Sequence, residues 1–269
     1  MTNTVVTSKS RSVWPRILAE ATAVSEREPT LAPVVQHSIL RFDRLEDALC
    51  FQLAEVLASQ LITSEALSAL FNELLKQDSS VLSGAERDIN AVLERDPATK
   101  SGLHVLLYLK GFHAIQIHRF AHLLWKTGRE DLAAYLQSRS SRVLQVDIHP
   151  AVLLGKGVFF DHATGIVIGE TAVIEDNVSI LQGVTLGGTG KDTGDRHPKV
   201  RHGVLIGASA TVLGNIEIGV NSKIGAGSVV LKSVENRKTV AGVPAKVIGG
   251  VQEREPARSM NQILYDVGL

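Results

Sequence analysis

From residue 148 to residue 184 the chain reads IHPAVLLGKGVFFDHATGIVIGETAVIEDNVSILQGV, and one apolar residue returns every six positions along it. This period fits neither one face of a helix nor the alternation of a simple strand, but it is typical of a hexapeptide β-helix. We therefore predict that each hexad forms one short strand and a corner, and that three hexads complete a triangular coil. The repeated residues are Ile148, Leu154, Phe160, Ile166, Ala172, Val178 and Val184 and, after an interruption, Val200, Ile206, Val212, Ile218, Ile224 and Val230.

The same period predicts which residues stack. Residues eighteen apart, such as Ile148, Ile166 and Val184, are expected to lie above one another at the β spacing of about 4.8 Å. Glycine follows many of the repeated residues, as at Gly155 and Gly157, because it accepts positive φ at a corner without steric cost. The alternative, a chance run of Ile-Gly pairs in an ordinary sheet, does not explain a period that survives so many repeats.

Composition limits the classes of partner. The 269 residues hold 28 Lys and Arg against 28 Asp and Glu, without a block of like charge, so neither nucleic acid nor a membrane surface is expected as partner. Residues 1–12 are polar and no apolar run approaches the length of a membrane span, which predicts a soluble cytoplasmic protein. Cys50 is the only cysteine, so neither an intrachain disulfide nor a cysteine-rich metal site is possible.

The chain before the repeats predicts an α-helical domain over residues 1–145, because its apolar residues recur three or four positions apart. Ser83 and Glu86 have the spacing of a capping box, which predicts a helix start there. That helix should end before Pro97, and Gly128 should end a later one. The expected helices, about six in number, lie near residues 14–21, 45–61, 67–74, 83–93, 112–127 and 130–142.

Polar residues break the apolar pattern of the repeats at two places. Asp147 and His149 enter the first hexad, and Asp161 and His162 occupy positions that apolar or small residues would otherwise take. Such departures from a local rule are expected at functional sites. Asp147 and His162 are fifteen residues apart, three short of a full coil, so we expect them on adjacent layers, offset around a corner.

The interruption of the repeat predicts a loop. About ten extra residues, 190–199, separate the hexads at Val184 and Val200, and an insertion in a solenoid must be extruded because the rungs on either side stay paired. The loop carries Asp192 and Asp195, and then Arg196 and His197, which suit recognition of a small carboxylate because a guanidinium can form two parallel hydrogen bonds with it. A plain solvated loop is the alternative.

These features divide the chain into a helical domain (1–145), a β-helix domain with an extruded loop (146–249, loop 190–199) and a C-terminal tail (250–269). Pro244 is expected to end regular strand pairing and to cap the coil. The tail is polar, and we predict that it is irregular and mobile. The fold class is therefore α+β, a helical bundle followed by a parallel β-helix.

The sequence resembles the bacterial serine acetyltransferases, hexapeptide acyltransferases that form O-acetylserine for cysteine biosynthesis. The most specific segments are Asp161-His-Ala-Thr-Gly-Ile166 and Gly194-Asp-Arg-His-Pro-Lys199. The resemblance covers residues 90–249, and its other segments are Leu107-Tyr-Leu-Lys-Gly-Phe-His113, Gln145-Val-Asp-Ile-His-Pro150, Gly169-Glu-Thr-Ala172, Val184-Thr-Leu-Gly-Gly-Thr-Gly190 and Ala241-Gly-Val-Pro-Ala245.

The resemblance implies a left-handed β-helix and a role for each candidate residue. His162 would be the general base that takes the proton of the serine hydroxyl, and Asp147 would orient its imidazole. Backbone N–H groups near Gly187 and Gly188 would stabilise the tetrahedral oxyanion. Cys50 is far from every motif, so direct transfer is expected. The substrate-binding residues would be Arg196 and His197 for the serine carboxylate, and Asp96 and Asp161 for its ammonium group.

The resemblance also implies partners. Acetyl-CoA would be the co-substrate, without a metal, and would lie along the outside of the coil between two subunits, near Gly188, Ala208, Lys223 and Ala226. Trimers would pair into a hexamer through the helical domains, and L-cysteine would inhibit at the serine site. Family members that bind O-acetylserine sulfhydrylase, the next enzyme, typically end in isoleucine, whereas this chain ends in Leu269.

Three alternatives remain open from the sequence. The acceptor can be another hydroxyl compound, such as homoserine or a sugar. A metal-dependent hydratase like the γ-class carbonic anhydrases would use zinc held by His149, His162, His197 or His202. A non-catalytic trimeric scaffold would act only by binding a partner through its tail, although the retained Asp147 and His162 argue against it.

Overall fold

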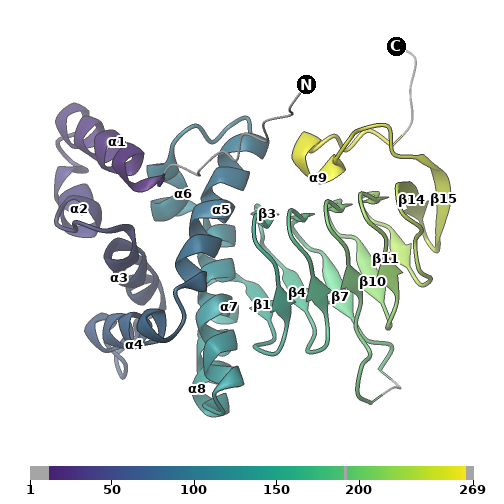
Figure 1. Ribbon diagram of the computed structural model, residues 1–269, viewed down its shortest axis with the longest axis horizontal. Helices are drawn as coiled ribbons and strands as arrows, with labels where there is room; N and C mark the ends of the chain where they lie inside the picture. Colours follow the sequence, from purple (N-terminus) through teal and green to yellow (C-terminus); the bar gives the residue numbers. More distant parts are fainter. Residues whose placement is uncertain (1–11, 191–192, 265–269) are drawn as a thin grey trace, which may run out of the picture.

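The computed structural model describes residues 12–190 and 193–264. A helical part comes first, and a triangular coil of short strands lies beside it (Figure 1). Over these two ranges, no helix is both long enough and apolar enough to cross a membrane. The helices before the coil are α1 (Trp14–Arg27), α2 (Ala32–Val35), the π-helical turn η1 (Gln36–Leu40), α3 (Leu45–Leu57), α4 (Ser64–Gln77), α5 (Ser80–Arg95), α6 (Gly102–Tyr108), α7 (Lys110–Lys126) and α8 (Glu130–Leu144).

The start of α5 corrects one prediction. The helix begins at Ser80, and the hydroxyl of Ser83 donates to the carbonyl oxygen of Ser80, so the predicted capping box is wrong. The N-cap is Ser79, whose side chain makes no capping hydrogen bond, and the Ser80 N–H donates instead to Oδ1 of Asp78 at 2.8 Å. The predicted end before Pro97 is confirmed, since α5 ends at Arg95. The short helices α2 and α6 were not predicted, because so few residues show too little of a period.

Three sheets form the three sides of the coil, and the chain passes from sheet A to sheet B to sheet C on each turn. Successive layers pair in parallel, as the hexapeptide period predicts. Sheet A contains β1 (Val146–Ile148), β4 (Ile166–Ile168), β7 (Thr185–Gly187), β10 (Thr211–Leu213) and β13 (Val229–Val230). Sheet B contains β2 (Leu153–Leu154), β5 (Val173–Ile174), β8 (Lys199–Val200) and β11 (Glu217–Ile218). Sheet C contains β3 (Phe159–Asp161), β6 (Ser179–Leu181), β9 (Leu205–Ile206), β12 (Lys223–Ile224), β14 (Lys238–Gly242) and β15 (Ala245–Gly250).

The corners between sheets stack into three edges along the coil. The AB edge consists of the connections that leave sheet A, at residues 149–152, 169–172, 188–190 with 193–198, and 214–216. The BC edge consists of the connections at 155–158, 175–178, 201–204 and 219–222. The CA edge consists of the connections that enter sheet A, at 162–165, 182–184, 207–210 and 225–228.

The register of the first coil differs from the prediction. Ile148 pairs with Ile168, twenty residues on, rather than with Ile166. The two additional residues lie in the corner between β3 and β4, where His162 and Ala163 both adopt positive φ, 55° and 61°. The next layer returns to a spacing of eighteen. This two-residue shift in register could not be predicted from the sequence, because Ile166 and Ile168 both point into the coil and are both buried.

The extruded loop is confirmed but shorter than predicted. Val173 pairs with Lys199, 26 residues on, whereas Lys199 pairs with Glu217, 18 residues on, so the insertion is eight residues. Lys199 therefore belongs to β8 rather than to the loop. The loop leaves the coil at the AB edge and extends beyond the other corners (Figure 1).

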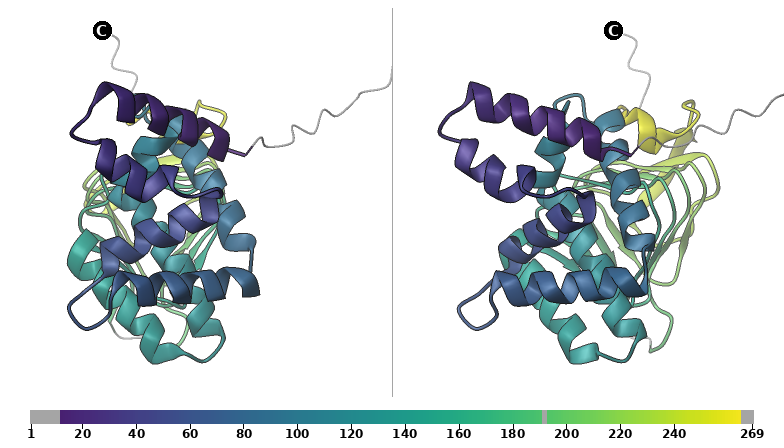
Figure 2. Two further views of the ribbon diagram at one scale, coloured as in Figure 1. Left: turned by 90° about the vertical axis from the view of Figure 1, so that its left-hand side faces the viewer. Right: turned by 60° about the vertical axis from the view of Figure 1, so that its left-hand side comes forward.

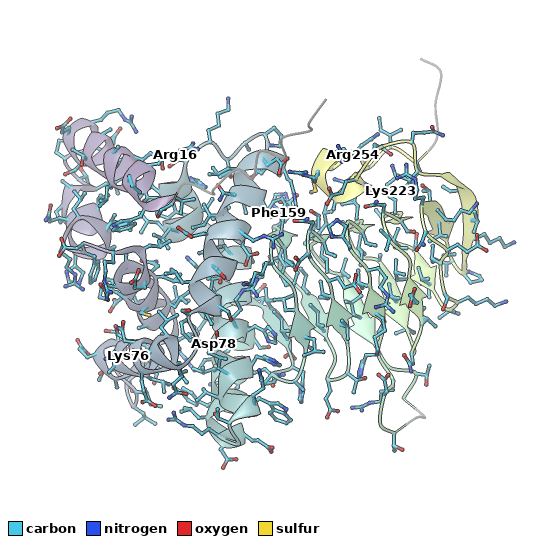
Figure 3. The ribbon with its side chains drawn as sticks, viewed as in Figure 1. Arg16, Lys76, Asp78, Phe159, Lys223 and Arg254 are labelled. Carbon is cyan, nitrogen blue, oxygen red and sulfur yellow. The ribbon has the colours of Figure 1, made fainter. Side chains whose placement is uncertain are left out.

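Helix α7 joins the helical part to the first coil. Its side chains are buried on nearly all sides, because other helices cover one face and β3 covers the opposite face. A Cβ at Gly111 would lie 2.1 Å from the carbonyl oxygen of Phe160, so only glycine permits this approach. Phe159 lies at the same boundary (Figure 3).

The C-terminal segment corrects the prediction for Pro244 and adds one short helix to the predicted irregular tail. Strand pairing does not end at Pro244, because β14 pairs antiparallel with β15 on either side of it. Residues 251–264 then return to the helical part as α9 (Pro256–Ser259), beside α5 (Figure 2). Ala257 is fully buried and its carbonyl oxygen accepts a hydrogen bond of 2.8 Å from the Ser179 hydroxyl. Residues 251–255 and 260–264 have no regular secondary structure, as predicted, but the short helix α9 was not predicted. Residues 265–269 lie outside the described ranges.

Candidate active site

The predicted base His162 lies on the CA edge. Its left-handed backbone turns the chain from sheet C into sheet A and leaves the side chain 74% exposed. The imidazole Nε2 lies 3.8 Å from Oδ1 of Asp161, the last residue of β3. An exposed imidazole next to a carboxylate can take a proton from a hydroxyl group.

A second carboxylate, that of Asp96, lies near Asp161. Asp96 follows α5, and its two oxygens accept hydrogen bonds from the Ala98 N–H (2.8 Å) and the Thr99 hydroxyl (2.6 Å). Burial raises the pKa of Asp161, His162 lowers it, and the negative charge of Asp96 raises it again. Among the described residues neither carboxylate forms an ion pair with a lysine or arginine. Two carboxylates without such a partner suit the ammonium group of a substrate.

Asp147 lies apart from His162 within the chain. It is the middle residue of β1, and its neighbours Val146 and Ile148 are buried, so its side chain points out of the coil. Its Oδ1 accepts a hydrogen bond of 2.7 Å from Nε2 of Gln137 in α8. No ion pair within the described ranges links Asp147 to His162, whose acidic partner is Asp161. The structure of one chain therefore does not bring the predicted dyad together.

The predicted carboxylate-binding residues Arg196 and His197 lie on the AB edge, at the base of the extruded loop. Nη2 of Arg196 donates to Oε2 of Glu170 at 2.7 Å, and its Nη1 donates to the carbonyl oxygen of Gly194 at 3.0 Å. The Thr171 hydroxyl oxygen accepts hydrogen bonds from the backbone N–H groups of Arg196 (2.9 Å) and His197 (3.0 Å). Burial lowers the pKa of His197, and the positive charge of Arg196 lowers it further, which favours a neutral imidazole.

The predicted cofactor contacts also divide between two edges. Ala208 and Ala226 lie on the CA edge, where the Gly227 N–H donates to the Ala208 carbonyl oxygen at 2.8 Å. Gly188 lies on the AB edge, where a Cβ would contact Cγ of Arg196 at 3.4 Å.

Lys223, the fourth predicted cofactor contact, is only 4% exposed in β12. Its Nζ donates to the carbonyl oxygens of Asn261 (3.0 Å) and Ile263 (2.8 Å) in the C-terminal segment (Figure 3). The ammonium group of Lys223 is therefore bound by the chain itself in this structure.

The histidines of the hydratase alternative lie on three different edges. His149 and His197 are on the AB edge, His162 on the CA edge and His202 on the BC edge. The described parts of the chain contain no group of three or more His, Cys, Asp or Glu residues placed to hold a metal ion. One chain thus does not gather the zinc ligands that this alternative requires.

Cys50 is unsuited to carry an acetyl group. It is fully buried in α3, and burial raises the pKa of its thiol to about 12. Because the thiolate is the nucleophile, this thiol stays inert near neutral pH. Its position agrees with the expectation of direct transfer.

Sequence reasoning assigned no role to three residues that contact the candidate side chains. Gln137 binds Asp147, Glu170 binds Arg196, and Thr171 binds both Arg196 and His197. The segment from Gly169 to Ala172 was recognised only as a family motif. The feature that could have indicated a role is the presence of a glutamate and a threonine in a corner of a mostly apolar coil. Their partner Arg196 follows Thr171 by 25 residues and Glu170 by 26, so the sequence does not show the contact.

Comparison with known proteins identifies the family. The family model described as "Serine acetyltransferase, N-terminal" matches residues 13–117. The serine acetyltransferase of Salmonella typhimurium is 52% identical over 93% of this chain and 92% of its own length. The structure of the Brucella abortus serine acetyltransferase in complex with coenzyme A has a TM-score of 0.88 and 54% identity, covering 89% of this chain and 96% of that one. A serine acetyltransferase in complex with cysteine has a TM-score of 0.92 and 51% identity, covering 94% and 98%. The chain is thus a member of the serine acetyltransferase family.

Proposed function

We propose that this protein transfers the acetyl group of acetyl-CoA to the hydroxyl group of L-serine, giving O-acetyl-L-serine and CoA. The observation that carries the proposal is the position of His162, an exposed imidazole next to the carboxylates of Asp161 and Asp96. A general base beside two carboxylates that can bind an ammonium group suits an acetyl acceptor whose amino group lies close to its hydroxyl group. The Brucella relative was solved with coenzyme A, which supports acetyl-CoA as the donor.

The residues then have the following roles. Nε2 of His162 takes the proton of the serine hydroxyl as its oxygen bonds to the acetyl carbonyl carbon. Backbone N–H groups near Gly188 stabilise the oxyanion of the tetrahedral intermediate. The C–S bond then breaks, and the thiolate of CoA leaves with the proton that His162 holds. Asp161 and Asp96 bind the ammonium group of serine, and Arg196 and His197 bind its carboxylate.

Such a site requires a second copy of the chain. His162 is on the CA edge, directly after Asp161 at the end of β3, whereas Arg196, His197 and Gly188 are on the AB edge, on the other side of sheet A. We infer that the CA edge of one subunit faces the AB edge of the next. Because the two surfaces differ, this contact is heterologous, and a ring closes it. A trimer built in this way has three equal sites, and the pairing of two trimers through the helical parts would give a hexamer. Asp147 of one subunit can reach His162 only within such an assembly.

Regulation and location complete the proposal. L-cysteine has the same amino and carboxylate groups as serine, so it would bind the same site and inhibit, and a relative was solved in complex with cysteine. O-acetylserine sulfhydrylase would bind the C-terminal tail, whose last residues 265–269 lie outside the described ranges. The cytoplasm is the proposed compartment.

The test is the release of CoA thiol from acetyl-CoA with L-serine, with L-homoserine and without an acceptor. Serine-dependent release, with homoserine a poor competitor at equal concentration, would support the proposal. A preference for homoserine would overturn the choice of acceptor. No release from folded, oligomeric protein would overturn the activity itself. Inhibition by L-cysteine is measured separately by the loss of absorbance of the thioester bond, because cysteine is itself a thiol.

A further inference from the structure

Thr171, on the AB edge, makes four hydrogen-bond contacts with Arg196 and His197. Its hydroxyl oxygen accepts the N–H groups of Arg196 and His197, and it also lies 2.9 Å from Nδ1 of His197. Its backbone N–H donates to the same Nδ1 at 3.2 Å. With two lone pairs occupied by N–H donors, the hydroxyl can only donate to Nδ1. The same hydroxyl also interacts with Asp195, but the backbone N–H of Thr171 still donates to Nδ1 of His197.

These contacts decide where the proton of the His197 imidazole lies. A backbone N–H can only donate, so Nδ1 must be an acceptor without a proton. In a neutral imidazole the proton is then on Nε2. The opposite tautomer would place two N–H groups against each other and would present an acceptor, not a donor, at Nε2.

The other ring nitrogen of His197 remains available. His197 is only 6% exposed, and no hydrogen bond to a described residue occupies its Nε2. The ring lies directly over Gly169, where a Cβ would come within 2.0 Å of Nε2. Glycine at this position therefore lets the His197 ring pack against the corner of the coil. Beside it, Glu170 holds one side of the Arg196 guanidinium and leaves other N–H groups for a ligand.

We propose that Thr171 is a positioning residue that fixes His197 as an Nε2–H donor beside Arg196, and so makes the AB edge selective for acceptors with a carboxylate. This inference rests on the proposed function, because it assigns the carboxylate of serine to Arg196 and His197. A carboxylate accepts from both Nε2–H and the guanidinium. An uncharged amide, as in L-serinamide, offers one acceptor oxygen and an NH₂ group that conflicts with these donors.

The experiment compares Thr171→Val with Thr171→Ser. Valine keeps the shape of threonine but removes the hydroxyl, whereas serine keeps the hydroxyl. For Thr171→Val we expect the KM for L-serine to rise about 10- to 100-fold, with kcat within about threefold. The N–H groups of Arg196 and His197 lose their acceptor and Nδ1 of His197 loses the hydroxyl donor, so both side chains should shift away from the serine carboxylate. The KM for acetyl-CoA and the kcat/KM for L-serinamide should change little. Thr171→Ser should restore the KM for L-serine.

Two further measurements separate positioning from general damage. In a His197→Ala background, Thr171→Val should raise the KM for L-serine much less than it does alone, because the residue through which it acts is gone. Nitrogen-15 NMR of the imidazoles, with His197→Ala to identify the signal, should report an Nε2–H tautomer in the wild type and a changed signal in Thr171→Val.

Three outcomes would overturn the inference: an unchanged KM for L-serine in Thr171→Val, an equal loss of activity with L-serine and L-serinamide, or an Nδ1–H tautomer in the wild type. Failure of the proposed function is a different result, because the wild type itself would then show no serine-dependent release of CoA.

Discussion

His162 and His197 lie on opposite edges of sheet A, His162 before the first residue of β4 and His197 after the last residue of β7. A side chain on one edge cannot meet a ligand bound at the other edge of the same coil, because the strands of sheet A lie between them. The two histidines can act on one substrate only if they come from different subunits.

Mixed oligomers should therefore regain activity. His162→Ala and Arg196→Ala each inactivate one edge, so each variant alone should be impaired. When the two are co-expressed in equal amounts, about a quarter of the subunit contacts should join an intact CA edge to an intact AB edge, because each edge is intact half of the time in random mixing. Activity of the purified mixture near that fraction of wild type is expected. Activity no higher than that of the separate variants would contradict a shared site.

The proposed base His162 should contribute strongly to kcat. His162→Ala should lower kcat by about 10²–10⁴, the usual contribution of a positioned general base, and should leave the KM for acetyl-CoA nearly unchanged. Steady-state kinetics with L-serine measure this. His104→Ala, at an exposed histidine on α6, is the control and should keep wild-type kcat. If His162→Ala retains kcat, His162 is not the base.

The contact between the helices and the coil depends on one buried ion pair. Asp88 is fully buried, its Oδ2 accepts from Nη2 of Arg119 (2.7 Å), and its Oδ1 accepts from the Val158 N–H (2.9 Å). Asp88→Ala leaves the buried guanidinium without its partner, so it should lower the free energy of unfolding by about 3–5 kcal/mol. Urea unfolding measures this change.

A surface ion pair is the control for Asp88. Arg129 and Glu73 form one at 3.3 Å, with side chains 41% and 56% exposed. Glu73→Ala should change the free energy of unfolding by no more than about 1 kcal/mol. Equal losses in Asp88→Ala and Glu73→Ala would show that the buried pair does not stabilise the contact.

Acid should destabilise the fold through His118. This histidine is 4% exposed and its Nε2 lies 3.1 Å from the carbonyl oxygen of Val152; burial is the main cause that lowers its pKa to about 3. Between pH values of about 6.5 and 3 the unfolded chain binds a proton that the folded chain does not, so the free energy of unfolding falls as the pH falls.

The test of His118 is the slope of the free energy of unfolding against pH. One such proton corresponds to about 1.4 kcal/mol per pH unit. His118→Gln, which cannot titrate, should flatten the slope between pH 6 and 4 by nearly that amount. An unchanged slope would mean that other groups control acid stability.

The hexapeptide period alone predicts the fold of the second half of the chain. A sustained period of six is typical of a parallel β-helix, in which each layer repeats the same strand and corner. The period does not determine the register of the first coil, because Ile166 and Ile168 are equally apolar and both fit the inside of the coil. The contacts of the C-terminal segment could not be predicted for a related reason, since the partners of Ala257 and Lys223 are far from these residues in sequence.

The sequence by itself thus determined the coil, its extruded loop and the helical nature of the first part, and it named the candidate site residues, because these follow from local periods and from motifs. Only the tertiary structure decided on which edge of the coil each candidate site residue lies. The edge on which a side chain lies depends on how many residues each corner takes up, and the two additional residues at His162 and Ala163 are visible only in the pairing of strands. The separation of His162 from His197 across sheet A, and the contact of Thr171 with a ring 26 residues later, follow from that stacking.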